Sequence, residues 1–178
     1  MKKAFTPLLA LFFLAGSGFT FLAAAGDWRI ADGYSIIFST EEASGIFKNF
    51  KGTIVFDEQH PASSKFDVTI DAASINTGNA LQNKHAKSDE WFDAAKYPQI
   101  HFVSRNFAGT SAGYQVTGDL EMHGVKKPFT IPFTFKRTAT GGLFAGVFIV
   151  NRTDFHVGKP GGQVSDQIKL EVSVPVTK

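Results

Sequence analysis

The sequence predicts an all-β fold, an eight-stranded antiparallel barrel with a short helical segment near residues 79–96. Three observations support this prediction. Apolar and polar residues alternate along most of the chain, turn signals recur about every 8–12 residues, and the one stretch with helical character lies between two strand-rich halves. Strands that alternate in this way bury one face, so they form either a closed sheet or a sandwich. We favour the barrel, because a helical plug between the two halves would cover one of its ends.

The first 25 residues are predicted to be a secretory signal peptide, which leaves residues 26–178 as one domain. A basic start is followed by the apolar run Leu8–Leu14 and by Ala23–Ala25, a small-residue cleavage site. A membrane anchor is the alternative, but Gly16–Gly18 interrupt the apolar run and leave it short for a membrane span. We therefore expect a periplasmic or secreted protein.

Composition limits what residues 26–178 can bind and how they are held together. Without the two lysines of the signal they carry 16 basic and 16 acidic side chains, so no nucleic acid partner is expected. The absence of cysteine excludes disulfides, thiol catalysis and thiolate metal sites, and the apolar core must hold the domain. Fourteen of the 19 phenylalanines lie in this domain. They suit a wide, dry interior, although an ordinary phenylalanine-rich core would have the same composition.

The strands predicted before the helical segment are short and separated by clear turn signals. Asp32-Gly33 forms a turn, and residues 41–49, which contain Gly45, are expected to be a loop or an irregular edge. Apolar residues occupy alternate positions of each strand, so they are expected to share the inward face. These strands span residues 28–31, 34–40, 50–56 and 66–71.

The helical segment begins at Asn79, whose side-chain oxygen can cap the first turn. Residues 80–88 contain no Gly, Pro or β-branched residue and can be helical. Residues 93–96 predict one more helical turn, which must stop before Pro98. The adjacent aromatics Trp91-Phe92 would point about 100° apart on a helix, so at least one should face the barrel mouth. The alternative is that both close a solid core.

The strands predicted after the helical segment are longer. The first begins at Ile100 and frays at residues 104–106. Pro132 and Pro175 lie on the outward faces of their strands, and because proline removes a ladder donor, both positions should be edges or bulges. The later strands span residues 116–122, 129–135, 143–150 and 168–176, and a long loop at residues 151–162 precedes the last of them.

No pattern of catalytic or metal-binding residues stands out in the sequence. Asp89, Glu90 and Asp93 could be paired carboxylates for acid–base chemistry, but capping of a helix start explains them more simply. No His-Glu-x-x-His motif or nucleophile signature occurs, and a metal site would need three histidines to converge from separate strands. The histidines are His60, His85, His101, His123 and His156. We therefore predict no enzymatic activity, no metal and no cofactor.

Three stretches, in order along the domain, carry motifs of a known family. The first runs from Lys84-His85 through Ser88-Asp89-x-x-Phe92-Asp93 to Lys96-Tyr97-Pro98-x-Ile100-x-Phe102. The others are Gly118-Asp119-Leu120-x-x-His123-Gly124-Val125-x-Lys127-Pro128 and Asn151-Arg152-x-Asp154-Phe155. Together they resemble the YceI-like family, exported lipid-binding proteins with a lipocalin-like β-barrel. The resemblance covers essentially residues 26–178, but Gln82-Asn83 stand where the family usually has an Arg-Asp pair.

The resemblance implies an elongated barrel that takes a long polyisoprenoid or a similar lipid into its interior. The inward faces of the predicted strands carry no acid or base, which suits such a ligand, since each buried methylene contributes roughly 0.8 kcal/mol. The side chains predicted to bind the ligand are Phe38, Phe50, Ile54, Phe56, Val68, Trp91, Phe102, Leu120, Phe133, Phe135, Phe148 and Leu170.

The function expected from these observations is that of an exported carrier for a long apolar lipid, such as a polyisoprenoid, an isoprenoid quinone or a fatty-acid-like molecule. One alternative is an accessory protein or enzyme that acts on a bound quinone or isoprenoid. Another is a structural or stress protein whose barrel has a filled core. A homodimer and a transient contact with a membrane are both compatible with the sequence.

Overall fold

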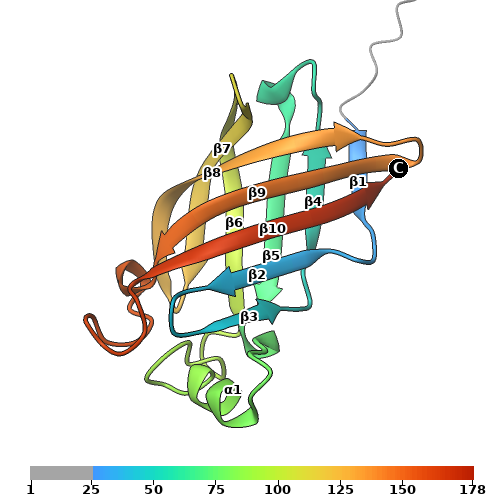
Figure 1. The fold of residues 1–178 in the computed structure, drawn as a ribbon. Coiled ribbons are helices and arrows are strands. Elements are labelled where there is room, and N and C mark those ends of the chain that lie inside the picture. The colour runs from blue at the N-terminus through green and yellow to red at the C-terminus, as the bar shows by residue number, and fades with distance from the viewer. Residues whose placement is uncertain (1–25) are drawn as a thin grey trace, which may run out of the picture.

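A computed structural model describes residues 26–178, so the predicted signal peptide lies outside the described residues. Within them the chain forms ten strands, one α-helix and three short 3₁₀ helices (Figure 1). The strands are β1 Gly26–Ile30, β2 Ser35–Ser39, β3 Ser44–Phe47, β4 Lys51–Phe56, β5 Lys65–Asp71, β6 Gln99–Thr110, β7 Gly113–Met122, β8 Val125–Arg137, β9 Gly141–Asn151 and β10 Gln167–Thr177. The helices are η1 Pro61–Ser63, η2 Ala72–Ser74, α1 Ala80–Ala86 and η3 Arg152–Phe155.

Eight of the described strands close into an antiparallel barrel, which confirms the predicted fold class. Their order is β1-β4-β5-β6-β7-β8-β9-β10, and the ring closes where β1 pairs with β10 through Arg29 and Thr177. The other two strands continue this ring. β2 follows β1 along the chain and pairs with an earlier part of β10, and β3 precedes β4 and pairs with β2. The segments β1–β2 and β3–β4 are therefore two long strands, each interrupted once.

Two segments predicted to be irregular contain strands. Residues 41–49, expected to be a loop or an irregular edge, contain β3, the last strand in the sheet order, so the edge alternative holds and the loop does not. Gly45 serves close packing there. A Cβ on Gly45 would lie 2.5 Å from the carbonyl oxygen of Asn76. The prediction that the next strand frays at residues 104–106 was wrong, because β6 continues to Thr110 through a bulge. The Ser104 hydroxyl replaces a ladder acceptor at that bulge, since it accepts a hydrogen bond from the Phe66 amide at 2.8 Å.

The helical segment is confirmed as one short helix followed by turns. The side chain of Asn79 caps α1 by accepting from the amides of Leu81 and Gln82. The helix ends at Ala86, two residues earlier than expected. Residues 93–96 form a single turn rather than a helix, closed by the Tyr97 amide, which donates to the Asp93 carbonyl at 2.8 Å. The carboxylates at positions 89, 90 and 93 therefore lie in turns and not at a helix start.

The barrel end away from α1 is filled by aromatic side chains. Phe56 is 1% exposed and lies at the centre of this end, with Phe133, Phe135 and Phe144 around it at ring-centroid distances of 5.2–5.5 Å. Trp28 adds its indole, whose Nε1 donates to the Phe56 carbonyl at 3.1 Å. This packing closes one end of the barrel, and the mouth lies at the other end, where residues of α1 line the cavity. Figure 1 shows α1 beyond that end of the strands.

Strands β8 and β9 pair along only part of their length. Their ladder joins residues 134–137 to residues 142–145 and then stops. Pro128 and Pro132 keep their places in the β7 ladder, so their nitrogens, which carry no proton, face β9. We call the unpaired stretch between residues 125–133 of β8 and residues 146–151 of β9 the seam.

Both outward-facing prolines lie where the sequence predicts an edge or a bulge. Pro132 borders the seam, as described above. Pro175 lies on β10 opposite the interruption at residues 31–34 between β1 and β2, and its carbonyl accepts from the Ala31 amide at 2.9 Å. These placements confirm that proline marks the breaks in this sheet.

Candidate functional site

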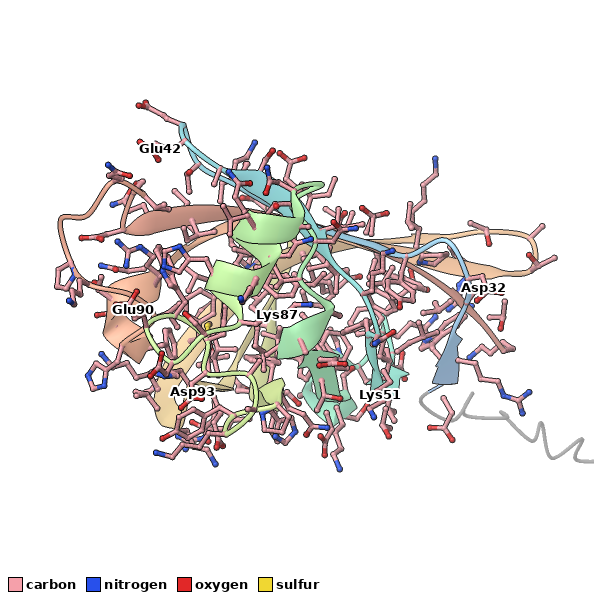
Figure 2. The ribbon with its side chains drawn as sticks, turned by 90° about the horizontal axis from the view of Figure 1, so that it is seen from below. Asp32, Glu42, Lys51, Lys87, Glu90 and Asp93 are labelled. Atoms are coloured by element: carbon pink, nitrogen blue, oxygen red, sulfur yellow. The ribbon has the colours of Figure 1, made fainter. Side chains whose placement is uncertain are left out.

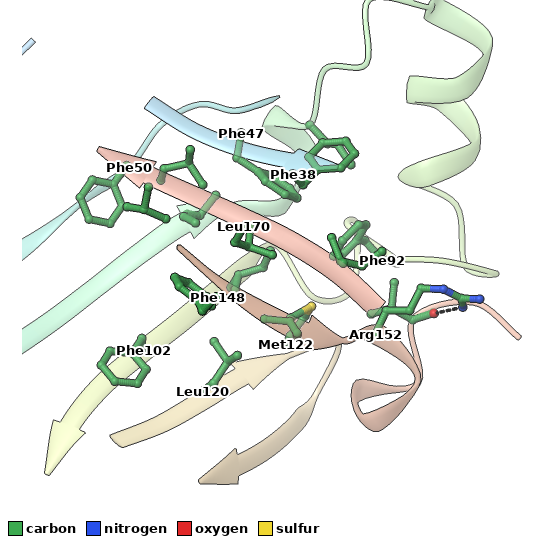
Figure 3. Close-up of a pocket in the computed structure, with 18 of the residues that line it drawn as sticks. Phe38, Phe47, Phe50, Phe92, Phe102, Leu120, Met122, Phe148, Arg152 and Leu170 are labelled. Carbon is green, nitrogen blue, oxygen red and sulfur yellow. Dashed lines mark hydrogen bonds between the residues drawn. The ribbon is translucent and has the colours of Figure 1, made fainter. Parts of the chain in front are cut away.

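The half of the barrel toward α1 is hollow. Its cavity has a volume of about 470 Å³ and is lined by side chains from β2 to β10, from α1 and from the loops at the mouth. This volume falls within the roughly 300–1,000 Å³ that is usual for small-molecule sites. Figure 3 shows phenylalanines, leucines and a methionine converging on it from several strands.

Ten of the twelve residues predicted to bind a ligand line this cavity. They are Phe38, Phe50, Ile54, Val68, Trp91, Phe102, Leu120, Phe133, Phe148 and Leu170. The other two, Phe56 and Phe135, lie in the packed aromatic end instead. Alternation assigns a side chain to the inward face, but it does not give the depth at which the barrel changes from hollow to filled. That the ten residues touch a ligand stays a prediction.

Residues 77–97, which include α1, border the mouth, and we call them the lid segment; its aromatic pair faces the cavity. Trp91 and Phe92 both line it, which confirms that at least one of them faces the mouth. Phe92 packs edge-on against Phe47 of β3 with ring centroids 5.8 Å apart. The lid is fixed at its far end by Tyr97, which packs against His123 and lies so close to Gly124 that a Cβ there would be 2.5 Å away. The turn at Gly124, in the second family motif, therefore packs against Tyr97 and fixes the lid segment, which contains most of the first motif.

Sequence reasoning missed lining residues of two kinds. Some lie on the predicted inward faces and could have been included by the same alternation, such as Ile36, Met122 and Ile131. Others lie outside the strands, where the period-two alternation does not apply, such as Gln82 in α1 and Gln163 in the loop after η3. The missed residues at the mouth thus carry most of its polar chemistry.

Arg152 is the buried charged residue of the described structure, at 3% exposure, and it organises the loop at the mouth. Its guanidinium donates to the carbonyls of residues 157, 159, 164 and 165 at 2.7–3.0 Å and to the Asp166 carboxylate at 2.6 Å. It also lies 5.1 Å from the centre of a Trp91 ring. One side chain therefore ties the loop at residues 156–166 to the barrel and to the lid.

The titratable side chains that line the cavity all lie at its mouth. They are Glu42, His85 and Arg152, and the strands contribute none. The Ser165 amide donates to the Glu42 carboxylate at 3.1 Å, and this bond, with a second from Thr40, lowers the pKa of Glu42. In Figure 2, which looks from below, Lys87 and Glu90 project from the lid segment and Glu42 from the tip of the β2–β3 hairpin.

The described residues offer neither a metal site nor a spanning helix. Among residues 26–178, no three side chains of His, Asp or Glu come together closely enough to hold a metal ion. In the same part of the chain, the α-helix is too short and too polar to cross a membrane. What the site offers chemically is a deep apolar interior and a polar mouth.

Comparisons with known proteins agree on one family. The model of the YceI-like domain matches residues 28–176. Protein YceI of Escherichia coli O157:H7 is 33% identical over 196 residues, covering 98% of this chain and 97% of that protein. The crystal structure of Burkholderia cenocepacia BcnA superposes with a TM-score of 0.80 at 28% identity, covering 84% of this chain and 100% of that one. A polyisoprenoid binding domain from Saccharophagus degradans shares the fold, with a TM-score of 0.61 at 16% identity over 87% of this chain and 95% of that one.

Proposed function

This chain belongs to the YceI-like domain family, and from that premise and its cavity we propose that it is an exported binding protein for a long apolar lipid. The lipid would be a polyisoprenoid, an isoprenoid quinone or a fatty-acid-like molecule, with its tail inside the barrel and its head group at the mouth. The observation that carries this proposal is the apolar cavity of about 470 Å³, closed at one end by aromatic packing and bordered by polar groups at the other.

The energetics of tail burial support a carrier. Each methylene that leaves water contributes roughly 0.8 kcal/mol, so ten of them contribute about 8 kcal/mol. That gain is comparable to the estimated 4–15 kcal/mol cost of losing translational and rotational freedom, so a longer tail is needed for tight binding. An apolar tail that finds no titratable group in the strands loses none of this gain to the desolvation of a charge.

The contrast between the two barrel ends favours a ligand over a filled core. At the closed end, Phe56 is 1% exposed and surrounded by other rings. Toward the mouth, Phe148, Leu170 and Val172 face the cavity and are only half-buried. A barrel whose interior served stability alone would continue the aromatic packing to the lid.

Export is part of the proposal because of the basic and apolar pattern of the first 25 residues. The test is to express the full chain in a Gram-negative host and to fractionate the cells. We expect the protein in the periplasm or the medium, with Gly26 as its first residue by N-terminal sequencing. Recovery of the uncleaved chain in the cytoplasm would contradict this part.

The test of lipid binding is mass spectrometry of an organic extract from the natively purified protein, followed by titration of the lipid-free protein with a polyisoprenoid, a quinone and a fatty acid. We expect a stoichiometric lipid in the extract or saturable binding in the titration. Phe148→Asp places a charge inside the cavity and should abolish binding, whereas Ile149→Asp, on the outward face of the same strand and 56% exposed, should not. Equal binding by the two folded variants would refute the assignment of the cavity.

A further inference from the structure

The polar side chains that line the cavity gather at its mouth. They come from the β2–β3 hairpin, from the lid segment around α1, and from η3 and the loop after it. These residues are Thr40, Glu42, Thr77, Gln82, His85, Arg152 and Gln163. If a lipid tail fills the interior, its head group must lie among them, so their free hydrogen-bonding groups determine which head groups fit.

Three of these side chains are already committed to the protein. Arg152 donates to four loop carbonyls and to Asp166, as described above. The Thr40 hydroxyl accepts from the amides of Glu42 and Ala43 at 3.1 and 3.0 Å. The Thr77 hydroxyl donates to the Asn83 side chain at 2.9 Å. None of the three has its main hydrogen-bonding group available for a ligand.

The groups that remain are mostly neutral. The side-chain amides of Gln82 and Gln163 are exposed and have no hydrogen-bond partner among the described residues. His85 uses Nε2 toward Glu90 at 3.3 Å and leaves Nδ1 free. Two carboxamides and an imidazole supply both donors and acceptors, which is what a hydroxyl, a phenol or a primary amide requires.

The charges at the mouth disfavour an anion. The Glu42 carboxylate lines the cavity, and the hydrogen bond from the Ser165 amide lowers its pKa, which favours the charged form. Arg152, the lining cation of the described residues, is paired with Asp166 at 2.6 Å. Lys84 and Lys87 belong to the lid segment but do not line the cavity. A phosphate or carboxylate at the mouth would therefore meet a carboxylate without a lining cation free to pair with it.

We propose that the mouth selects lipids with an uncharged, hydrogen-bonding head group, such as a prenyl or fatty alcohol, a phenol or a carboxamide, over the phosphates and carboxylates of the same tails. This inference rests on the proposed function, because it assumes a tail in the cavity. Gln82 and Gln163 are the specificity residues, and Glu42 is the residue that rejects anions.

The test is a displacement assay with a fluorescent fatty probe and ligands that differ only in their head groups. The ligands are hexadecane, hexadecanol and hexadecyl phosphate, together with geranylgeraniol and geranylgeranyl diphosphate. We expect each alcohol to bind at least about tenfold more tightly than its phosphate, because an anion would lie close to an ionised carboxylate. Gln82→Ala combined with Gln163→Ala should bring hexadecanol close to hexadecane and leave hexadecane unchanged.

Two further variants test the charge argument. Glu42→Gln should strengthen phosphate binding and leave alcohol binding unchanged, and Gln82→Arg should strengthen it further. The matched control replaces Lys84 and Lys87 by Gln, which should leave the alcohol-to-phosphate ratio as it is. A fall in phosphate affinity in this control would assign anion binding to these lysines and would overturn the inference.

The outcomes separate the inference from the function on which it rests. If the phosphates bind as tightly as the alcohols or more tightly, the head-group inference is overturned while lipid binding stands. If the alcohols prevail but the two glutamine variants do not change their affinity, the assignment of Gln82 and Gln163 is overturned. If neither tail binds with any head group, hexadecane included, the proposed function fails and the inference fails with it.

Discussion

Replacing Arg152 tests whether one buried cation holds the mouth of the barrel together. Arg152→Met keeps the length and apolar stem of the side chain but removes every hydrogen bond of the guanidinium. Four carbonyls and the Asp166 carboxylate then lose a charged partner. Breaking a buried pair by removing one partner costs about 3–5 kcal/mol. The Asp166 side chain is 35% exposed and can recover water, so we expect a loss of about 3 kcal/mol.

The assay is urea denaturation of the wild type and the variant, with hydrogen exchange to locate the change. The free energy of unfolding should fall by the stated amount, and the amides of residues 156–166 should lose protection first. Ligand release should accelerate as well, because Val157 and Gln163 of this loop line the cavity. Arg105→Met is the matched control, since Arg105 pairs with Asp119 on the surface at 64% exposure and such pairs contribute at most about 1 kcal/mol.

A result that would refute the reasoning is a variant at position 152 whose stability and loop protection match those of the control at position 105. The loop would then be held by its own backbone and by Val157, which is 2% exposed. In that case the Arg152 guanidinium would not be needed to form the loop at the mouth.

Three further predictions follow from the packing and the charges. Phe56→Ala should lower the free energy of unfolding by about 3–5 kcal/mol in thermal or urea melts, whereas Phe148→Ala should cost clearly less, because Phe148 borders the cavity and is only half-buried. Gly45→Val should destabilise the β2–β3 hairpin, measured by hydrogen exchange, because its Cβ would meet a carbonyl at 2.5 Å; unchanged protection would contradict this. The pKa of Glu42 is lowered, so its bond to Ser165 should be present at neutral pH and lost as the pH falls through that lowered pKa. The exchange rate of the Ser165 amide, measured by NMR against Glu42→Gln, checks this, and an identical pH profile in both proteins would refute it.

The sequence was most informative where apolar and polar residues alternated regularly over several consecutive residues. Ile54 and Phe102 are buried on the inward side because each belongs to a period-two apolar series. Proline was equally informative, since Pro132 marks the edge of the paired region. Both signals are local, so a single sequence can carry them.

What the sequence could not give depends on contacts between distant residues. Gly45 by itself suggests a break in a strand, and only its contact with Asn76 shows that the glycine is needed for close packing. Phe56 and Phe148 have the same inward signature, but one lies among rings and the other faces the cavity, and only the filling of the closed end separates them. Gln163 lies at the mouth because the hydrogen bonds of Arg152 hold its loop there. The residues of that loop follow no periodic pattern from which this position could be predicted.

The seam has a consequence for aggregation. A strand edge without partners is a template for strands of other molecules, and natural sheets guard such edges with proline and lysine. Pro128 and Pro132 remove two donors from the β8 edge, and Lys126 and Lys127 add charge beside them. The Lys127 ammonium also lies 3.4 Å from the Asp154 carboxylate, across the end of the seam. The prolines that leave β8 without ladder donors toward β9 also leave it without donors toward a strand of another molecule, so the seam does not act as a template for aggregation.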